Sequence, residues 1–188
     1  MNIQVFGQFE LEEHIRNGGE IYSHLISIGN PGFIRRPDHV LPKLFKQSFS
    51  SILRLRFYDV RKKEQLGPQQ KIKRIPKKKD VKRVIKFFEK TKYEATGYNI
   101  HCWQGVSRST AVALILLYLI YEDEGKASKK LVEIRRQAMP NKLIVTLFDE
   151  MYNTNLGNFS ETVYKHRIEA MKEEILNSLP VEELESVE

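Results

Sequence analysis

The sequence predicts an α/β fold in which one domain holds a central, mostly parallel, twisted sheet flanked by helices. In the middle of the chain, short segments rich in β-branched and aromatic residues alternate with amphipathic or apolar segments long enough for helices. This alternation is typical of parallel sheets, whose strands need crossover helices between them. The length of 188 residues and the 41% hydrophobic content suit one sizeable core and exclude a chain that is disordered throughout.

The first half of the chain is expected to alternate strand and helix. Its expected elements are, in order, a strand at 1–6, a short helix at 10–16, a strand at 22–28, a helix at 41–49 and a strand at 51–58. Gly18 and Gly19 end the first helix, and Asp59 ends the last of these strands. Residues 60–76 are charged and contain two prolines, so they predict an exposed loop.

Helices dominate the second half. Asp80 is expected to be the N-cap of a helix that runs to about residue 92 and buries an apolar stripe. The remaining expected elements are a strand at 96–100, a long apolar helix from Ser107 or Arg108 to about residue 123, and helices at 128–139, 142–152 and 160–178. Pro140 stops the first of the last three helices, and Asn141 is expected to cap the second.

Three absences narrow the class of protein. The longest nearly apolar run, 111–121, has eleven residues, whereas a membrane-spanning helix needs about 20. The single cysteine, Cys102, excludes an intramolecular disulfide framework and a zinc site built from several cysteines. The N-terminus lacks the basic start and apolar segment of a secretory signal, so we expect a cytoplasmic protein without stable membrane insertion.

The net charge of +7 is concentrated in one segment. Residues 71–83, the basic block, hold six Lys and two Arg against one acid, Asp80, and so account for the whole excess. Two interpretations stay open. Either the block contacts a polyanion, such as an acidic phosphopeptide, RNA, a nucleotide or an anionic membrane surface, or it is a solvated face. In the second case the acidic tail, whose residues 172–188 sum to −5, partly neutralises it.

The residues around the single cysteine form a pattern suited to an anion. A predicted strand ends at Cys102, a helix is expected to begin about six residues later, and Gly105 allows a tight turn between them. The N–H groups of such a turn and the positive end of the helix favour a bound anion and the thiolate form of a cysteine. Arg108 can hold two phosphate oxygens with its planar guanidinium. The pattern therefore predicts a nucleophilic thiolate beneath a phosphate site.

These residues also match a known signature. The order His-Cys-x-x-Gly-x-Ser-Arg-Ser resembles that of cysteine-dependent protein phosphatases in the dual-specificity-like branch, with fixed positions at His101, Cys102, Gly105, Ser107, Arg108 and Ser109. Residues 53–59 are similar to the family's strand before its general-acid loop, and 127–152 resemble the helical end of small prokaryotic predicted protein tyrosine phosphatases. The resemblance covers roughly residues 22–152. We therefore expect a dual-specificity-phosphatase-like catalytic domain at 1–157, and the sequence after it indicates a C-terminal helix and acidic tail at 158–188.

The resemblance implies a two-step reaction that needs no metal ion and no cofactor. Cys102 attacks phosphorus and forms a phosphocysteine, while the guanidinium of Arg108 and the main-chain amides of the loop hold the phosphate oxygens. The expected substrate-binding residues are Trp103, Gln104, Gly105, Val106, Ser107 and Arg108. Ser109 is expected to donate to the sulfur of Cys102 as it leaves, and His101 to support the loop from behind.

An aspartate is expected to protonate the leaving oxygen and then to activate water. Asp59 is the first candidate because it follows the strand at 51–58, although it lies 43 residues before Cys102, further than we expect for this branch. Asp80 is the rival, with a helix N-cap as its alternative role. Asp38 lies too far back in the sequence. Whether Asp59, Asp80 or neither is the acid stays open.

The predicted function is a phosphatase acting on phosphotyrosine in proteins, with phosphoserine and phosphothreonine as further substrates. Trp103, Gln104, Val106 and Ser107 include no Lys or Arg, which favours a singly phosphorylated substrate. Two alternatives stay open. One is the same chemistry on a non-protein anion, such as an RNA 5′ phosphate, a nucleotide or a phosphoinositide. The other is a phosphate-binding module with little turnover.

Overall fold

A computed structural model describes residues 1–31, 41–60 and 74–178 of the chain. In these parts, four strands form one sheet in which every neighbouring pair is parallel, in the order β1-β4-β2-β3. The strands are β1 (Asn2–Gly7), β2 (His24–Gly29), β3 (Ser51–Arg56) and β4 (Gly97–Cys102). The predicted parallel sheet is confirmed, and most of the loop expected at 60–76 lies outside the described residues.

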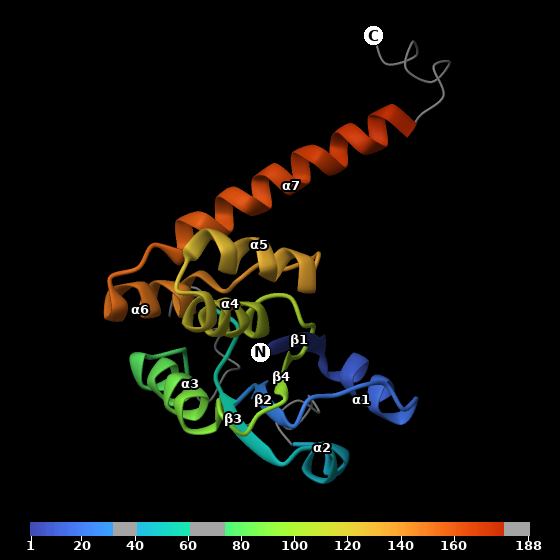
Figure 1. Ribbon diagram of the computed structural model, residues 1–188, viewed down its shortest axis with the longest axis vertical. Helices are drawn as coiled ribbons and strands as arrows, with labels where there is room; N and C mark the ends of the chain where they lie inside the picture. The colour runs from blue at the N-terminus through green and yellow to red at the C-terminus, as the bar shows by residue number, and fades with distance from the viewer. Residues whose placement is uncertain (32–40, 61–73, 179–188) are drawn as a thin grey trace.

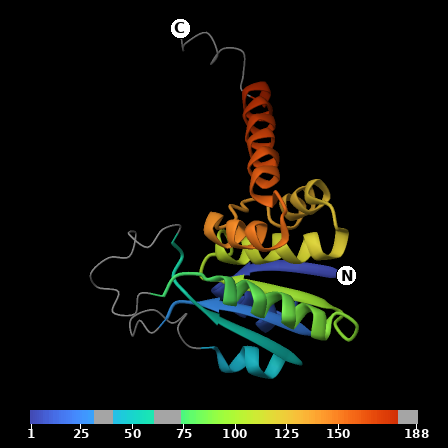
Figure 2. The same cartoon turned by 90° about the vertical axis from the view of Figure 1, so that its left-hand side faces the viewer.

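Helices cover both faces of the sheet (Figure 1). Helices α1 (Gln8–Arg16) and α2 (Lys43–Ser48) lie against one face, and α3 (Lys78–Thr91) and α4 (Arg108–Tyr121) against the other. Helices α5 (Glu124–Ile134) and α6 (Lys142–Tyr152) pack on α4, and α7 (Leu156–Ser178) packs on α5 and α6. Figure 2 shows the far end of α7 extending beyond the rest of the molecule. The predicted α/β class is confirmed.

Each face of the sheet has its own apolar core. The smaller core lies under α1 and α2 and contains Phe6, Leu11, Leu25, Phe45 and Phe49. The larger core joins all four strands to α3, α4, α5 and α6, and it includes Cys102. Because α4 lies between the sheet and two further helices, its residues 108–117 are all buried. That position explains why the sequence of α4 is apolar on every side.

The N-cap expected for α3 is wrong. The helix begins at Lys78, its N-cap is Lys77, and Asp80 is the third helical residue. The carboxylate of Asp80 accepts a hydrogen bond from the backbone N–H of Lys77 at 2.9 Å and pairs with the guanidinium of Arg74. Asp80 therefore stabilises the start of α3 from inside the first turn, which places its negative charge at the positive end of the helix.

Helices α5 and α7 both begin four residues earlier than expected. Asp123 caps α5 by accepting from the N–H of Lys126 at 2.7 Å, and α5 ends at Ile134. The cap expected for α6 is confirmed, because the side-chain oxygen of Asn141 accepts from the N–H of Ile144 at 3.2 Å. Among all helices in the described ranges, none is long and apolar enough to cross a membrane.

The carboxyl ends of the strands meet at one edge of the sheet. Cys102 is the last residue of β4, Asn30 directly follows β2, and Phe57 directly follows β3. The chain then passes from Cys102 through residues 103–107 into α4, whose N-terminus points at the same edge. In parallel α/β sheets this edge is where ligands bind. The topology therefore brings the cysteine, a helix N-terminus and two neighbouring strand ends together.

Candidate active site

Residues 103–107, hereafter the 103–107 loop, make a turn that glycine alone permits. Gly105 has a φ of +72°, in the left-handed region that residues with a Cβ atom seldom adopt. A Cβ atom there would lie 2.5 Å from the backbone nitrogen of Gly7 and from the carbonyl carbon of Phe6. The turn therefore packs directly on the end of β1, with no room for a side chain.

The carbonyl oxygens of the 103–107 loop all accept hydrogen bonds from groups around the loop. Three of them accept from backbone N–H groups: Trp103 O from Gln8 (3.1 Å), Val106 O from Met139 (2.9 Å), and Ser107 O from both Asn141 (3.1 Å) and Ala111 (3.0 Å). The other two, Gln104 O and Gly105 O, accept from the guanidinium of Arg135 at 3.4 and 3.1 Å. The hydroxyl of Thr110 donates to Val106 O and Ser107 O as well.

This pattern orients the amides of the loop. In a planar trans peptide the C=O of one residue and the N–H of the next point in opposite directions. The N–H groups of residues 104–108 therefore point away from the groups that hold the carbonyls. Within the described parts of the chain, none of these five amides donates a hydrogen bond. Five directed N–H groups at the start of α4 make a cradle for an anion.

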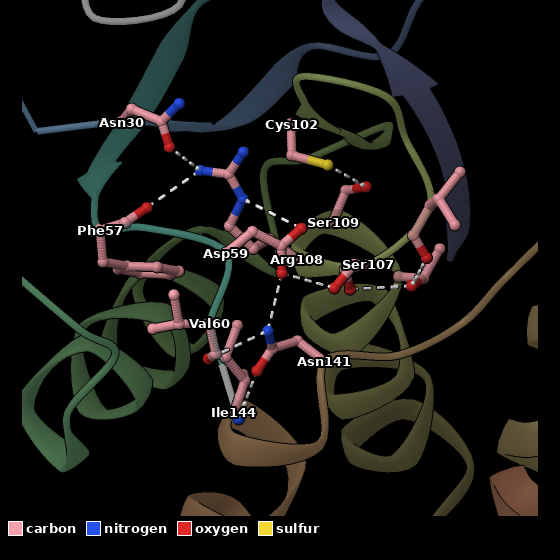
Figure 3. A network of polar contacts seen from close by, with 12 residues as sticks. Asn30, Phe57, Asp59, Val60, Cys102, Ser107, Arg108, Ser109, Asn141 and Ile144 are labelled. Carbon is pink, nitrogen blue, oxygen red and sulfur yellow. Dashed lines mark hydrogen bonds and ion pairs between the residues drawn. The ribbon is translucent and has the colours of Figure 1, made fainter. Parts of the chain in front are cut away.

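Cys102 and Ser109 lie side by side at the base of this cradle (Figure 3). Cys102 is buried at the end of β4, and its Sγ lies 3.2 Å from the Oγ of Ser109, in the first turn of α4. A hydroxyl at this distance can donate to a thiolate and so stabilise it. The arrangement suits a sulfur that attacks and later departs.

Arg108 is held from two neighbouring strands. Its side chain is buried, and one terminal nitrogen donates to the Oδ1 of Asn30 and to the carbonyl of Phe57, both at 2.9 Å (Figure 3). These two acceptors take up one nitrogen and fix the plane of the guanidinium. The Nε lies 3.7 Å from the Oδ2 of Asp59 and has no hydrogen-bond acceptor among the described residues. The two strand ends thus orient the whole guanidinium of Arg108.

Asp59 lies at the same site, next to Arg108. Its Oδ1 accepts from the hydroxyl of Ser107 at 2.7 Å and from the amide of Asn141 at 2.8 Å (Figure 3). Its side chain is 39% exposed, against 3% for Asp80. The structure therefore brings Asp59 to the 103–107 loop and keeps Asp80 at the start of α3. Asp38 lies outside the described residues.

His101 lies behind the cradle, in the body of the sheet. It is fully buried, and its Nε2 lies 2.6 Å from the Oγ of Ser27, which accepts from Arg54 at 2.5 Å. Burial, aided by the charge of Arg54, lowers the pKa of His101 to about 3. The imidazole is therefore neutral near pH 7, which suits a role in holding β4 and the loop rather than in proton transfer.

The remaining predicted substrate-binding side chains belong to the 103–107 loop itself. Trp103 is half-buried, and its ring meets that of Phe9 edge-on at 5.1 Å. Gln104 is exposed, and Val106 is half-buried. Trp103 thus packs toward α1.

Several residues that hold the site were not predicted from the sequence. Asn30 and the carbonyl of Phe57 bind Arg108, and Arg135 binds the carbonyls of the loop. A polar residue directly after a strand was an available signal for Asn30, because such positions meet at one sheet edge. Arg135 also pairs with Glu10, with a shortest N–O distance of 2.6 Å.

Comparison with known proteins defines the class of fold. No family model and no curated protein matches the sequence. Among solved structures, DUSP15 is 18% identical, with a TM-score of 0.52 over 89% of this chain and 90% of that one. Tk-PTP in the active form is 14% identical, with a TM-score of 0.53 over 82% of this chain and 94% of that one. PTPMT1 in complex with PI(5)P is also 14% identical, with a TM-score of 0.53 over 88% and 94%.

These likenesses show that the chain has the fold of dual-specificity and protein tyrosine phosphatases. The fold agrees with the resemblance found in the signature around Cys102.

Proposed function

We propose that the chain is a cysteine-dependent phosphatase that hydrolyses phosphomonoesters through a phosphocysteine intermediate. The observation that carries this proposal is the convergence of Cys102, the anion cradle, Arg108 and Asp59 at one edge of the sheet. Each of these groups suits a separate task in phosphoryl transfer: attack, charge stabilisation and proton transfer.

In the first step, the thiolate of Cys102 forms a bond to phosphorus as the bond to the leaving oxygen breaks. Protonated Asp59 gives its proton to that oxygen, so the alcohol departs neutral. Because Ser107 and Asn141 both donate to Oδ1, the proton of the acid belongs on Oδ2. The amides of the loop and Arg108 hold the three remaining phosphoryl oxygens, where the transition state carries its charge.

In the second step, water attacks the phosphocysteine and transfers a proton to the carboxylate of Asp59. The phosphorus–sulfur bond breaks, and inorganic phosphate leaves. The sulfur regains its negative charge, which the hydroxyl of Ser109 stabilises from 3.2 Å. The site returns to its starting state.

For the substrate we propose phosphotyrosine in proteins, with phosphoserine and phosphothreonine as further substrates. The side chains at 103, 104, 106 and 107 include no cation, which disfavours several phosphate groups on one small substrate. Trp103 directly follows the nucleophile in the sequence, and its ring contact with Phe9 supports a leaving group that carries a ring. We also propose a cytoplasmic setting, because a reducing compartment keeps Cys102 as a thiol.

The test is hydrolysis of p-nitrophenyl phosphate by the wild type and by Cys102→Ser. We expect the wild type to release p-nitrophenol. In Cys102→Ser, which retains the cradle but lacks the thiolate, the rate of hydrolysis should fall by about a hundredfold or more. A wild type that binds inorganic phosphate without hydrolysing any phosphomonoester would instead favour a phosphate-binding module.

A second candidate function is the same chemistry on a polyanionic substrate. On α3, four lysines repeat every three or four residues and so share one exposed face: Lys79, Lys82, Lys86 and Lys90. No carboxylate in the described ranges pairs with any of them. In contrast, Arg74 and Lys78 of the basic block pair with Asp80 and Glu150. The block therefore continues along α3 as a cationic face that supports contact with a polyanion.

The two substrate classes differ in their response to charge on α3. A phosphotyrosine peptide and a 5′-phosphorylated RNA are compared in the wild type and in Lys82→Glu with Lys86→Glu, at two salt concentrations. If the polyanion is the substrate, the double variant lowers kcat/KM for RNA and weakens its dependence on salt, while hydrolysis of the peptide stays unchanged. Equal and small effects on both substrates would indicate that the cationic face is a solvated surface without a role in substrate choice.

A further inference from the structure

Arg135 binds the 103–107 loop from the side opposite the cradle. It directly follows α5, and its Nε donates to Gly105 O at 3.1 Å while a terminal nitrogen reaches Gln104 O at 3.4 Å. Within the described residues these two carbonyls accept from no other group. The carbonyls of Trp103, Val106 and Ser107 accept from backbone N–H groups, which the fold itself fixes. The middle of the loop thus depends on one side chain.

Glu10 of α1 holds that side chain in place. Its two oxygens accept from the two terminal nitrogens of Arg135 at 2.6 and 2.8 Å. One of the same oxygens accepts from the N–H of Gly7 at 2.9 Å, next to the point where Gly105 packs on β1. Glu10 and Arg135 therefore join α1, the loop and the end of α5 in one network.

The charge state of this pair is stable near neutral pH. Burial raises the pKa of Glu10, but the hydrogen bonds and the charge of Arg135 outweigh it, so the pKa lies below its ordinary value. The carboxylate is ionised at pH 7, and the pair adds no net charge behind the loop. Its effect on the cradle is therefore chiefly one of geometry.

We propose that Arg135, oriented by Glu10, is a positioning residue that aims the amides of Gly105 and Val106 at the phosphoryl oxygens and so sets the oxyanion affinity of the loop. The inference rests on the proposed phosphatase function. By holding the carbonyls of Gln104 and Gly105, Arg135 fixes the two peptide planes that carry those N–H groups. Donors aimed in advance cost no reorganisation when charge develops on the phosphoryl oxygens.

The experiment measures tungstate affinity and the hydrolysis of p-nitrophenyl phosphate in Arg135→Ala, Arg135→Lys and Glu10→Gln. We expect both Arg135 variants to lose about tenfold to a hundredfold in tungstate affinity and in kcat, with a smaller change in KM. Lysine does not rescue, because a single ammonium cannot bind two carbonyls and both oxygens of Glu10. Glu10→Gln, which keeps the size of the side chain, should lose less but in the same direction. The control is Arg136→Ala, an exposed arginine at the next position, which should match the wild type.

Folding of each variant is checked by circular dichroism and thermal unfolding. Folded Arg135 variants with tungstate affinity within about twofold of the wild type would overturn the inference. If neither Arg135 variant folds, Glu10→Gln decides, and an unchanged affinity there overturns it as well. A wild type that binds tungstate without turnover contradicts the phosphatase function, while the affinity series still decides the role of Arg135. A wild type that binds no tungstate overturns both.

Discussion

At the scale of single residues, Arg108 and Asp59 share one arrangement. Neighbouring residues hold one polar atom of each side chain and so fix the direction of its other polar atoms. One terminal nitrogen of Arg108 is held by Asn30 and Phe57, and Nε faces Asp59, so the other terminal nitrogen is the one that we propose binds the phosphate. One oxygen of Asp59 is held by Ser107 and Asn141, which leaves Oδ2 for the proton. Such supporting contacts restrict each group to one geometry before substrate arrives.

The role of Asp59 predicts a specific kinetic phenotype. Asp59→Asn retains an oxygen for Ser107 but supplies no proton, so we expect kcat for an alkyl phosphate to fall by about a hundredfold or more. Tungstate affinity should change little. The matched control is Asp80→Asn, which removes the partner of Arg74 and should lower stability without a comparable loss of kcat. The assignment of the acid fails if the two variants exchange these phenotypes.

Burial of His101 predicts a dependence of stability on pH. Its pKa is lowered from 6.5 to about 3 in the folded protein, so protonation favours the unfolded chain. The stabilisation is complete above about pH 6.5 and is lost as the pH falls toward 3, with a slope of at most roughly 1.4 kcal/mol per pH unit. Urea unfolding of the wild type and of His101→Asn between pH 7 and 4 measures the difference in slope. Parallel curves for the two proteins would contradict this account.

At the scale of elements, the turn between β4 and α4 decides whether the cradle forms. Gly105→Ala introduces both a strained φ and a Cβ atom 2.5 Å from the backbone of Gly7. We expect loss of oxyanion binding and of nearly all hydrolysis. Gly18 is the matched control, because it has the same φ of +72° but open space around a Cβ atom. Gly18→Ala should cost about 1–2 kcal/mol of stability and leave kcat unchanged. Equal effects at both positions would show that the close packing on β1 is unimportant.

Local patterns predicted most of these elements. Segments of β-branched, aromatic and alternating residues predicted all four strands, and the side chain of Asn141 marked the start of α6. The predicted start of α3 was wrong because Asp80, an acidic residue in the first turn, resembles an N-cap. The predicted start of α5 was wrong because Asp123, its N-cap, was taken as the end of α4. Cap residues depend on which N–H their side chain reaches, and the sequence alone does not fix that.

The supporting contacts of the site depended on tertiary structure. Arg135 lies 30 residues from Gly105 and 125 from Glu10, so no periodic pattern connects them. Asn30 and Arg108 are separated by 78 residues and meet only because β2 and β4 are neighbours in the sheet. The signature around Cys102 predicted the groups that we propose bind the phosphate, whereas the groups that orient them depend on the strand order.

At the scale of the whole molecule, the parallel sheet brings the candidate catalytic groups to one edge, and the cationic face lies along α3. The backbone N–H of Tyr58 donates to the carbonyl of Arg74 at 2.9 Å, so the start of the basic block adjoins the segment that carries Asp59. The charge of Arg74 itself is paired with Asp80.

The arrangement of α7 predicts where the chain can be shortened. Leu156 at its start is fully buried in the larger core, and Arg167 reaches the carbonyl of Val132 at 3.2 Å. A chain that ends at residue 171 keeps both contacts, so it should match the full chain in melting temperature and in hydrolysis of p-nitrophenyl phosphate. A chain that ends at residue 155 loses both and should be destabilised by about 2 kcal/mol or more. An inactive chain ending at 171 would give the C-terminal segment a role in the site.

The central claim is that Cys102 carries the phosphoryl group during turnover. The most direct measurement is rapid quenching of the reaction with p-nitrophenyl phosphate in Ser109→Ala, in which departure of the sulfur is slowed. The account predicts a burst of p-nitrophenol equal to the amount of enzyme, and a phosphorylated Cys102 in the quenched protein by mass spectrometry. Turnover that persists in Cys102→Ser, or phosphate found on another residue, would contradict it.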